Sequence, residues 1–258
     1  MSDVLVRREG DICIITLNRP ERMNALSDAM IDGIAAALDE AEAMQARAIV
    51  LTGAGRGFCS GADLKAHGAA TTRPDMSARL RRIIHPTILR MTRLPIPIVT
   101  ALNGAAVGAG ASYALAADFV VASRSAFLLF AFVNVGLVPD GGASWLLTHL
   151  VGRQRATEMM MLGERLPAEK AAEWGMVYKL VDDDRLIEEA MALARRLAKA
   201  PPASIRLMKR NLAIALEGSL EETLAAECVA QREAGYTEDF GEGLRAFAEK
   251  RPPVFTGR

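Results

Sequence analysis

Three stretches of this 258-residue chain decide its fold and carry its candidate chemistry: Gly57-Phe-Cys-Ser-Gly-Ala-Asp-Leu64, Asn103-Gly-Ala-Ala-Val-Gly-Ala-Gly110 and Gly136-Leu-Val-Pro-Asp-Gly-Gly142. The first two are predicted to lead from a strand into the start of a helix. Backbone N–H groups at helix starts have no partner within the helix and are supported by the helix dipole. Two of them that converge on one oxygen would form an oxyanion hole. On spacing alone, tight turns explain the glycines equally well.

Around these stretches, short apolar strands alternate with helices. Residues 12–17 and 48–52 are almost continuous apolar runs rich in β-branched side chains, as is typical of strands covered on both faces. Between them, Ser27 is placed to cap an amphipathic helix. A basic helix broken near Pro86 is expected at 78–92. The other expected segments are a glycine-rich loop over 53–61, a turn of helix from Ala62, and strands at 96–101, 119–122, 127–129 and 177–181. This alternation predicts an α/β fold.

A double proline, Pro201-Pro202, separates this part of the chain from a wholly helical end. Helices are predicted at 203–217, 219–234 and 238–250. We therefore predict an α/β body over 1–200 and a helical tail over 201–258. A tail of about 55 residues is small for an independent core, so it is expected to pack on the body or on another subunit.

The composition excludes several classes of function. The chain has 31 Lys and Arg against 31 Asp and Glu, and aromatic residues make up 5% of it, so no nucleic-acid partner is expected. Cys13, Cys59 and Cys228 have no metal-ligand spacing, which favours reduced thiols in a cytoplasmic protein. Residues 94–117 are uncharged but contain two prolines and three glycines, which predicts a buried strand, turn and helix rather than a membrane span.

Common catalytic motifs are not found in the sequence. None of His67, His85 and His149 stands in a zinc-binding pattern, so no metal site is predicted. The chain has no G-x-S-x-G nucleophile elbow and no P-loop, and Gly108-Ala-Gly110 lacks the third glycine of a dinucleotide site. The two glycine-containing loops therefore remain the main candidates for chemistry.

The three stretches together resemble the crotonase (enoyl-CoA hydratase/isomerase) superfamily. The segments Asn18-Arg-Pro20, Met23-Asn-Ala-Leu26 and Phe247-Ala-Glu-Lys-Arg251 add to this resemblance, which covers essentially the whole chain in the order of the family. It implies a spiral of ββα units with a C-terminal helical region that builds trimers, often paired into hexamers. It also implies an acyl-CoA thioester as the partner, and no cofactor other than the coenzyme A that the substrate carries.

The resemblance assigns roles to residues of both glycine-containing loops. It implies that the backbone amides of Ala62 and Ala109 hold the thioester oxygen. Phe247 and Lys250 are expected to reach the coenzyme A of a neighbouring subunit. Asp63 is expected to act as a turn or capping residue within its loop. The residues expected to lie along the coenzyme A are Arg22, Met23, Ala25, Leu26, Ser60, Asp63, Leu64 and Lys65. For each basic residue in this set, a charge that is merely solvated is an equally good explanation.

The departures from the family pattern concern its acids. Where the hydratases of the superfamily have two glutamates, this chain has Ser112 and Phe132, both expected at the substrate. The remaining acid is Asp140, which resembles the lone acid of several isomerases in the superfamily. This predicts an enoyl-CoA isomerase in which Asp140 moves the proton, with Val138 and Pro139 helping to exclude water. A helix cap before Ala143 is the structural alternative for Asp140.

His85 leaves other hypotheses about the function open. It is expected near the acyl pocket, and the 4-chlorobenzoyl-CoA dehalogenases of the superfamily pair a helix histidine with an aspartate in similar places. An aroyl-CoA hydrolase or dehalogenase using Asp140 and His85 is therefore one alternative. A hydratase with a non-standard acid/base set is another. A binding protein that has lost its chemistry is a third, since some members bind AU-rich RNA, although the balanced charge argues against it.

Overall fold

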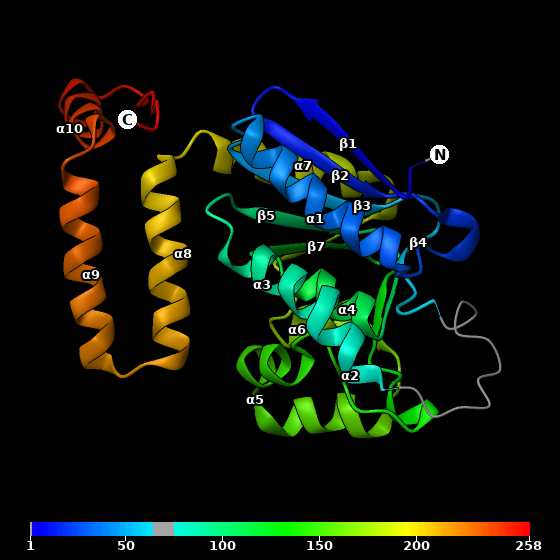
Figure 1. The fold of residues 1–258 in the computed structure, drawn as a ribbon. Coiled ribbons are helices and arrows are strands. Elements are labelled where there is room, and N and C mark those ends of the chain that lie inside the picture. The colour runs from blue at the N-terminus through cyan, green and yellow to red at the C-terminus, as the bar shows by residue number, and fades with distance from the viewer. Residues whose placement is uncertain (1, 64–74) are drawn as a thin grey trace.

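The computed structural model describes residues 2–63 and 75–258, and its body contains two β-sheets (Figure 1). The larger sheet has the strand order β1-β2-β3-β5-β7-β10. β1 pairs antiparallel with β2, and the other pairings are parallel. The strands of this sheet are β1 (Val4–Glu9), β2 (Ile12–Leu17), β3 (Ala48–Gly53), β5 (Ile98–Leu102), β7 (Phe119–Ser123) and β10 (Lys179–Val181).

The smaller sheet contains β4 (Gly57–Cys59), β6 (Ala105–Val107), β8 (Phe127–Leu129) and β9 (Leu166–Pro167). The expectation of uninterrupted loops around β4 and β6 was therefore wrong, because a strand of three residues is too short to show a period of two. The expected helical turn at Ala62 is wrong too. Ala62 forms a parallel bridge with Leu26, which needs extended backbone, and residues 64–74 lie outside the described part.

From β3 to β8, consecutive strands along the chain alternate between the two sheets. The pairs β3–β4, β5–β6 and β7–β8 each add their first strand to the large sheet and their second to the small one. Helical segments follow each pair, so the chain forms the expected spiral of ββα units. Because β4 and β6 are neighbours in the small sheet, the segments that follow them along the chain start side by side.

Helices cover both faces of the large sheet. α1 begins after Ser27, whose Oγ accepts a hydrogen bond from Met30 N at 3.0 Å, as predicted. α5 is interrupted at Gly152, whose φ of 74° and ψ of 166° are not helical. The helices of the body are α1 (Asp28–Ala43), α4 (Ala109–Leu115), α5 (Ala143–Leu162), α6 (Ala168–Glu173) and α7 (Leu186–Ala198), with short 3-10 turns at Pro20–Arg22, Val133–Val135 and Asp183–Arg185.

The predicted basic helix near Pro86 is irregular in the structure. It consists of α2 (Met76–Arg79), a π-helical turn (Leu80–Ile84) and α3 (His85–Arg93). Pro86 has no N–H to donate and its ring crowds the preceding turn, which accounts for a widened turn just before it. The widened turn brings Leu80, Ile84 and His85 to the wall of one cavity.

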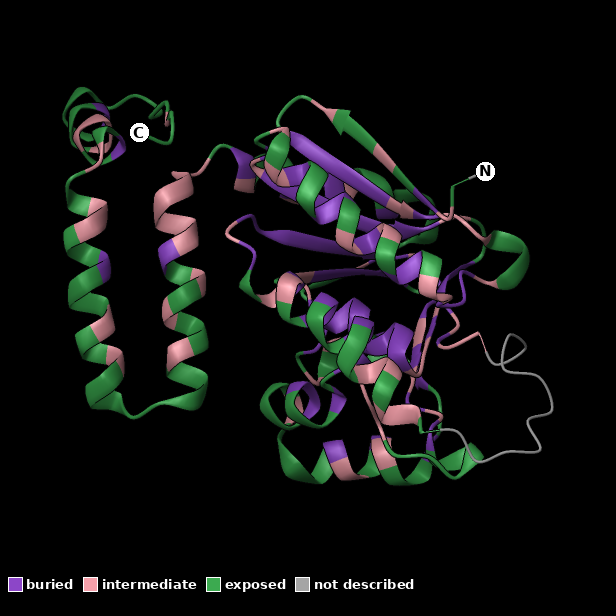
Figure 2. Ribbon diagram, viewed as in Figure 1, coloured by how far each residue is buried: buried purple, intermediate pink, exposed green. Residues whose placement is uncertain are grey.

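The core lies on both sides of the large sheet, whose inner strands are mostly buried (Figure 2), whereas the edge strand β1 is partly exposed. On β2, Ile12 and Ile14 face α7, while Cys13 and Ile15 belong to the cluster that contains α1. This two-sided burial explains why the strands are apolar without alternation. Residues 94–117 contribute β5, β6 and α4 to the core as predicted. No helix in the described ranges combines the length and apolar character needed to cross a bilayer.

The C-terminal part consists of α8 (Pro202–Glu217), α9 (Leu220–Gly235) and α10 (Glu238–Glu249). α8 and α9 form an antiparallel hairpin that stands beside the body, and α10 lies near the start of α8 (Figure 1). Ser219 and Glu222 form a capping box at the start of α9. Several large apolar side chains of these helices are exposed in the single chain, among them Met208, Leu212, Leu224, Val229 and Phe247.

Candidate active site

The segments that follow β4 and β6 are packed tightly against each other. Gly61 has a φ of +85°, and a Cβ atom on it would lie 2.7 Å from the carbonyl oxygen of Val107. Glycine alone tolerates both this backbone conformation and this close approach. Ala62 follows Gly61 in the first segment, and Ala109 follows Gly108 in the second. The close contact between the two segments therefore places both alanines on the same side of the molecule.

Both alanines present an unused backbone amide. In the bridge between Leu26 and Ala62, Leu26 N donates to Gly61 O at 2.8 Å and Asp63 N donates to Leu26 O, so the Ala62 N–H takes no part. Ala109 is the first residue of α4, where the N–H has no partner within the helix. Within the described ranges neither amide has an acceptor, and both residues line one cavity of about 500 Å³. Two residues with unused amide donors thus line a single space.

Asp140 is the one acidic residue among the described residues that line this cavity. Its Oδ1 atom is buried and has no hydrogen-bond partner in the part of the chain that the structure describes. The helix-cap alternative does not hold, because the N-cap of α5 is Gly142 and no side chain caps that helix. The carboxylate is therefore held at the cavity without a structural partner.

The environment of Asp140 favours its protonated form. Burial raises the pKa of the Asp140 carboxyl above its ordinary value, and the positive charges of His85 and Arg79 partly oppose this rise. A carboxylate with a raised pKa is a stronger base than an exposed aspartate, which suits proton abstraction near neutral pH. His85 itself is an exposed residue at the rim of the same cavity, at the first position of α3.

Residues 7–258 match the family model described as enoyl-CoA hydratase/isomerase. The chain belongs to this family. It is 42% identical to 1,2-epoxyphenylacetyl-CoA isomerase of Escherichia coli (strain K12) over the whole of both chains, and 44% identical to a probable enoyl-CoA hydratase of Rhodobacter capsulatus over 96% of this chain and 95% of the relative. The crystal structure of an enoyl-CoA hydratase from Bacillus anthracis has a TM-score of 0.94, at 32% identity, covering 99% of this chain and 100% of the other.

The protein is thus an enzyme of the crotonase family. Among the cavity residues that sequence reasoning missed, Arg79 is the charged one. The guanidinium of Arg79 donates to Asp28 Oδ1 at 2.8 Å and to Leu26 O at 2.9 Å. It thereby joins α2 to the segment that pairs with Ala62, and its charge acts on Asp140. No local pattern marks Arg79, because its partners lie about fifty positions earlier in the chain.

The segments expected along the coenzyme A lie together. Ser60 N donates to Met23 O at 2.9 Å, and Ser60 Oγ donates to Arg22 O at 3.3 Å, so the two segments form one continuous edge. Ala25 and Leu26 are buried within this edge, whereas Arg22 is exposed. Leu64 and Lys65 lie outside the described residues. Whether this edge binds coenzyme A stays a prediction.

Asp63 and Asp118 have structural partners. Asp63 lies 3.2 Å from the guanidinium of Arg19, in keeping with a role in holding its turn. Asp118 Oδ2 accepts hydrogen bonds from Ile98 N and from the ammonium of Lys209. Neither carboxylate lines the cavity. These contacts leave Asp140 as the carboxylate available to a ligand in the described cavity.

Ser112 and Phe132 are placed differently from each other. Phe132 lines the cavity and lies against Gly108, whereas Ser112 is fully buried behind Asp140 and is not part of the described cavity wall. The contact of Ser112 with substrate stays a prediction. Val138 lines the cavity and is 80% exposed in the single chain, and its role in excluding water also stays a prediction.

Phe247 and Lys250 lie on and just after α10, which is distant from α2 and α4 in the same chain (Figure 1). Phe247 is 86% exposed. Lys250 ends the helix in a left-handed conformation with a φ of 54°. Neither residue lines the described cavity of its own chain, and their contact with coenzyme A in a neighbouring subunit stays a prediction.

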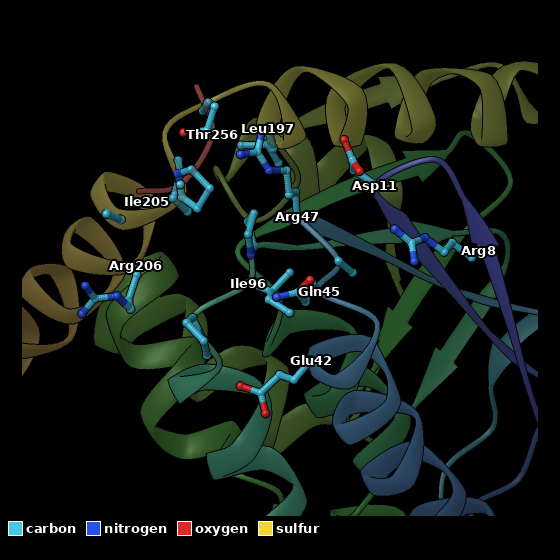
Figure 3. A pocket seen from close by; sticks show the side chains of 17 residues that line it. Arg8, Asp11, Glu42, Gln45, Arg47, Ile96, Leu197, Ile205, Arg206 and Thr256 are labelled. Atoms are coloured by element: carbon cyan, nitrogen blue, oxygen red, sulfur yellow. The ribbon is translucent and has the colours of Figure 1, made fainter. Parts of the chain in front are cut away.

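A second cavity of about 610 Å³ separates the body from α8 and the C-terminal segment (Figure 3). Three of its charged side chains, those of Arg47, Glu42 and Arg206, are engaged with the protein. Arg47 donates to Ala198 O and Phe255 O, Glu42 pairs with Arg90, and Arg206 with Glu233. Within the described ranges no group of three or more His, Cys, Asp or Glu side chains is placed to hold a metal ion. The cavity at Asp140 is therefore the candidate active site.

Proposed function

We propose that this protein is an enoyl-CoA isomerase, which shifts the double bond of an enoyl-CoA thioester. The observation that carries the proposal is the carboxylate of Asp140, the one carboxylate among the described residues of the cavity and without a hydrogen-bond partner among them. The same cavity is lined by Ala62 and Ala109, whose amides have no acceptor within the described ranges. Membership of the enoyl-CoA hydratase/isomerase family supports an acyl-CoA substrate, and the isomerase activity named for the Escherichia coli relative supports this reaction class.

The proposed mechanism uses one acid and two amide donors. The thioester oxygen accepts hydrogen bonds from Ala62 N and Ala109 N, which stabilise the negative charge that develops there. The Asp140 carboxylate removes a proton from C2 of a 3-enoyl-CoA, leaving a dienolate. The resulting carboxylic acid returns the proton at C4, so the double bond moves to C2–C3 and the enzyme is regenerated. One donor of this kind typically contributes about 2.7–4 kcal/mol to transition-state stabilisation.

The proposal is tested by incubating the purified protein with 3-enoyl-CoA and with 2-enoyl-CoA thioesters in D₂O. We expect the 3-enoyl-CoA to become a 2-enoyl-CoA of unchanged composition apart from deuterium, detected by chromatography, absorbance and mass. Hydration would instead add the mass of one water to the 2-enoyl-CoA. Formation of a hydrated product without any isomerisation would contradict the proposal.

Two other reactions remain candidates. A hydratase with a non-standard acid/base set is supported by the Rhodobacter capsulatus relative, which is named a probable enoyl-CoA hydratase. Hydrolysis or dehalogenation of an aroyl-CoA is supported by the placement of Asp140 and His85 on one cavity whose wall includes the aromatic side chains of Phe132 and Trp145. In the dehalogenation scheme the carboxylate attacks the halogen-bearing ring carbon and the halide leaves. Water activated by His85 then cleaves the resulting aryl ester, which releases the hydroxylated aroyl-CoA and regenerates the carboxylate.

His85→Ala distinguishes these schemes. If Asp140 alone moves the proton, kcat should fall by less than about tenfold, whereas loss of a general base should lower it by ~10²–10⁴-fold. The histidine charge holds the pKa of Asp140 down, so its removal should move the acid limb of the rate profile to higher pH. The measurement is kcat against pH with 3-enoyl-CoA. A loss of isomerase activity beyond a hundredfold would contradict the scheme in which Asp140 alone moves the proton.

We further propose that residues 201–258 join three chains into a homotrimer, or six into a dimer of trimers, in the cytoplasm. The exposed apolar side chains of the C-terminal helices support an assembly. Burial raises the pKa of the Cys59 thiol to about 12, which keeps it inert in a reducing compartment. Light scattering coupled to gel filtration should give three or six times the 27.7 kDa of one chain, and a monomer would contradict the assembly.

A further inference from the structure

Ser112 contacts the backbone of the catalytic acid. It lies on α4, one turn after Ala109, and is fully buried. Its Oγ donates a hydrogen bond to the carbonyl oxygen of Asp140 at 3.0 Å. The same carbonyl accepts a bond from Ala143 N at 3.1 Å. The backbone of Asp140 is thus held by two hydrogen bonds, while Oδ1 of its carboxylate has no partner in the described structure.

Gly141 closes the space beside Ser112. A Cβ atom on Gly141 would lie 3.0 Å from Ser112 Cβ and 3.2 Å from Ser112 Oγ, and Gly141 has a φ of +60°. The turn after Asp140 therefore rests directly on α4. A longer side chain at position 112 would have to displace this turn, because buried atoms in such contact leave no free volume.

We propose that Ser112 is a positioning residue that sets the distance between the Asp140 carboxylate and the oxyanion donor Ala109. Both ends of this distance depend on α4: Ala109 begins the helix, and Ser112 anchors the turn that carries Asp140. The inference rests on the proposed role of Asp140 as acid and base. It also explains why position 112 does not hold a second carboxylate here: the Asp140–Gly141 turn occupies the space that a glutamate would need.

The test compares Ser112→Ala with Ser123→Ala. Ser123 is also buried and also donates its hydroxyl to a carbonyl oxygen, that of Leu102, but it lies outside the cavity wall. For Ser112→Ala we expect kcat for isomerisation to fall by about 10- to 100-fold while KM changes by less than about threefold, since misplacing a catalytic group by about 1 Å can cost that much. Ser123→Ala should leave both values close to wild type.

Two further readouts separate positioning from packing. Ser112→Cys keeps a side chain of similar size but is a weak donor, so it should resemble Ser112→Ala in kcat if the hydrogen bond matters. In Ser112→Ala and in Ser112→Cys, the acid limb of the plot of kcat against pH should also move to a different pH. The charged groups that act on the Asp140 carboxyl, His85 on α3 and Arg79 on α2, remain in place in them. Ser112→Glu should gain no hydration of crotonyl-CoA.

The outcomes are distinguishable. If Ser112→Ala and Ser112→Cys both match Ser123→Ala in kcat and in pH profile, the positioning role is wrong, whereas the role of Asp140 stands as long as Asp140→Asn is inactive. If Asp140→Asn keeps its isomerase activity, the proposed function itself is wrong. If the alanine variant does not fold, the cysteine variant carries the comparison, and wild-type kcat with wild-type pH dependence in it overturns the proposal.

Discussion

Asp140→Asn is expected to abolish the conversion of 3-enoyl-CoA to 2-enoyl-CoA. Asparagine has nearly the shape of aspartate but cannot accept the C2 proton, and loss of a general base commonly lowers kcat by ~10²–10⁴-fold. In a site where one carboxylate both removes and returns the proton, we expect the upper end of this range. The measurement is the rate of isomerisation and of deuterium exchange at C2 and C4.

The same variant should fold and should bind acyl-CoA. Because the pKa of Asp140 is raised in the folded protein, the native state holds this proton more tightly than the unfolded state does. The contribution of Asp140 to stability is therefore present at low pH and is lost as the pH rises through its folded pKa. Asparagine carries no charge to bury, so at pH 7 the variant should have a Tm equal to or above that of wild type.

A suitable control is Asp184→Asn, which makes the same change at an exposed position outside the described cavity wall. It should isomerise at the wild-type rate. Binding of a saturated acyl-CoA to Asp140→Asn, measured by calorimetry, should remain within about threefold of wild type if the carboxylate contributes little to ground-state binding. Undiminished hydration of crotonyl-CoA by Asp140→Asn would contradict the single-acid mechanism.

Ala109→Pro is the second variant with a large expected effect. Proline at the first position of α4 removes the N–H without removing a helix hydrogen bond, and this position tolerates its fixed φ. Gly108 before it has a φ of 54° and a ψ of −128°, a positive-φ conformation outside the α region that proline disfavours in the preceding residue, and glycine can keep it. Loss of one oxyanion donor should lower kcat by ~10²–10³-fold.

Leu220→Pro provides the matched control, since it also places proline at the first position of a helix, α9, at an exposed residue far along the chain from the cavity. Circular dichroism and thermal unfolding should show both variants folded. We expect Ala109→Pro to lose kcat with a smaller change in the affinity for coenzyme A. A folded Ala109→Pro enzyme with wild-type kcat would show that this amide does not hold the thioester oxygen.

Arg79 illustrates what a sequence pattern does not reveal. Its partners, Leu26 O and Asp28, are distant in the chain, so these contacts form only when the segment from α2 to α3 packs against α1. The strands β4 and β6 escaped prediction for a related reason, since three residues carry no detectable period and their pairing is non-local. The contact of Ser112 with Asp140 likewise joins two elements through the fold alone.

Local rules, by contrast, were sufficient for much of the architecture. Long apolar runs specified the strands at 12–17 and 48–52, because a strand covered on both faces must be apolar at every position. Ser27 and the double proline specified helix ends, because caps and missing N–H groups act within a few residues. The order of the glycine-containing stretches was enough to predict the family and to nominate Asp140. The tertiary structure alone decided which groups share the cavity and which carboxylate is left without a partner, because those properties depend on side chains that only the spiral brings together.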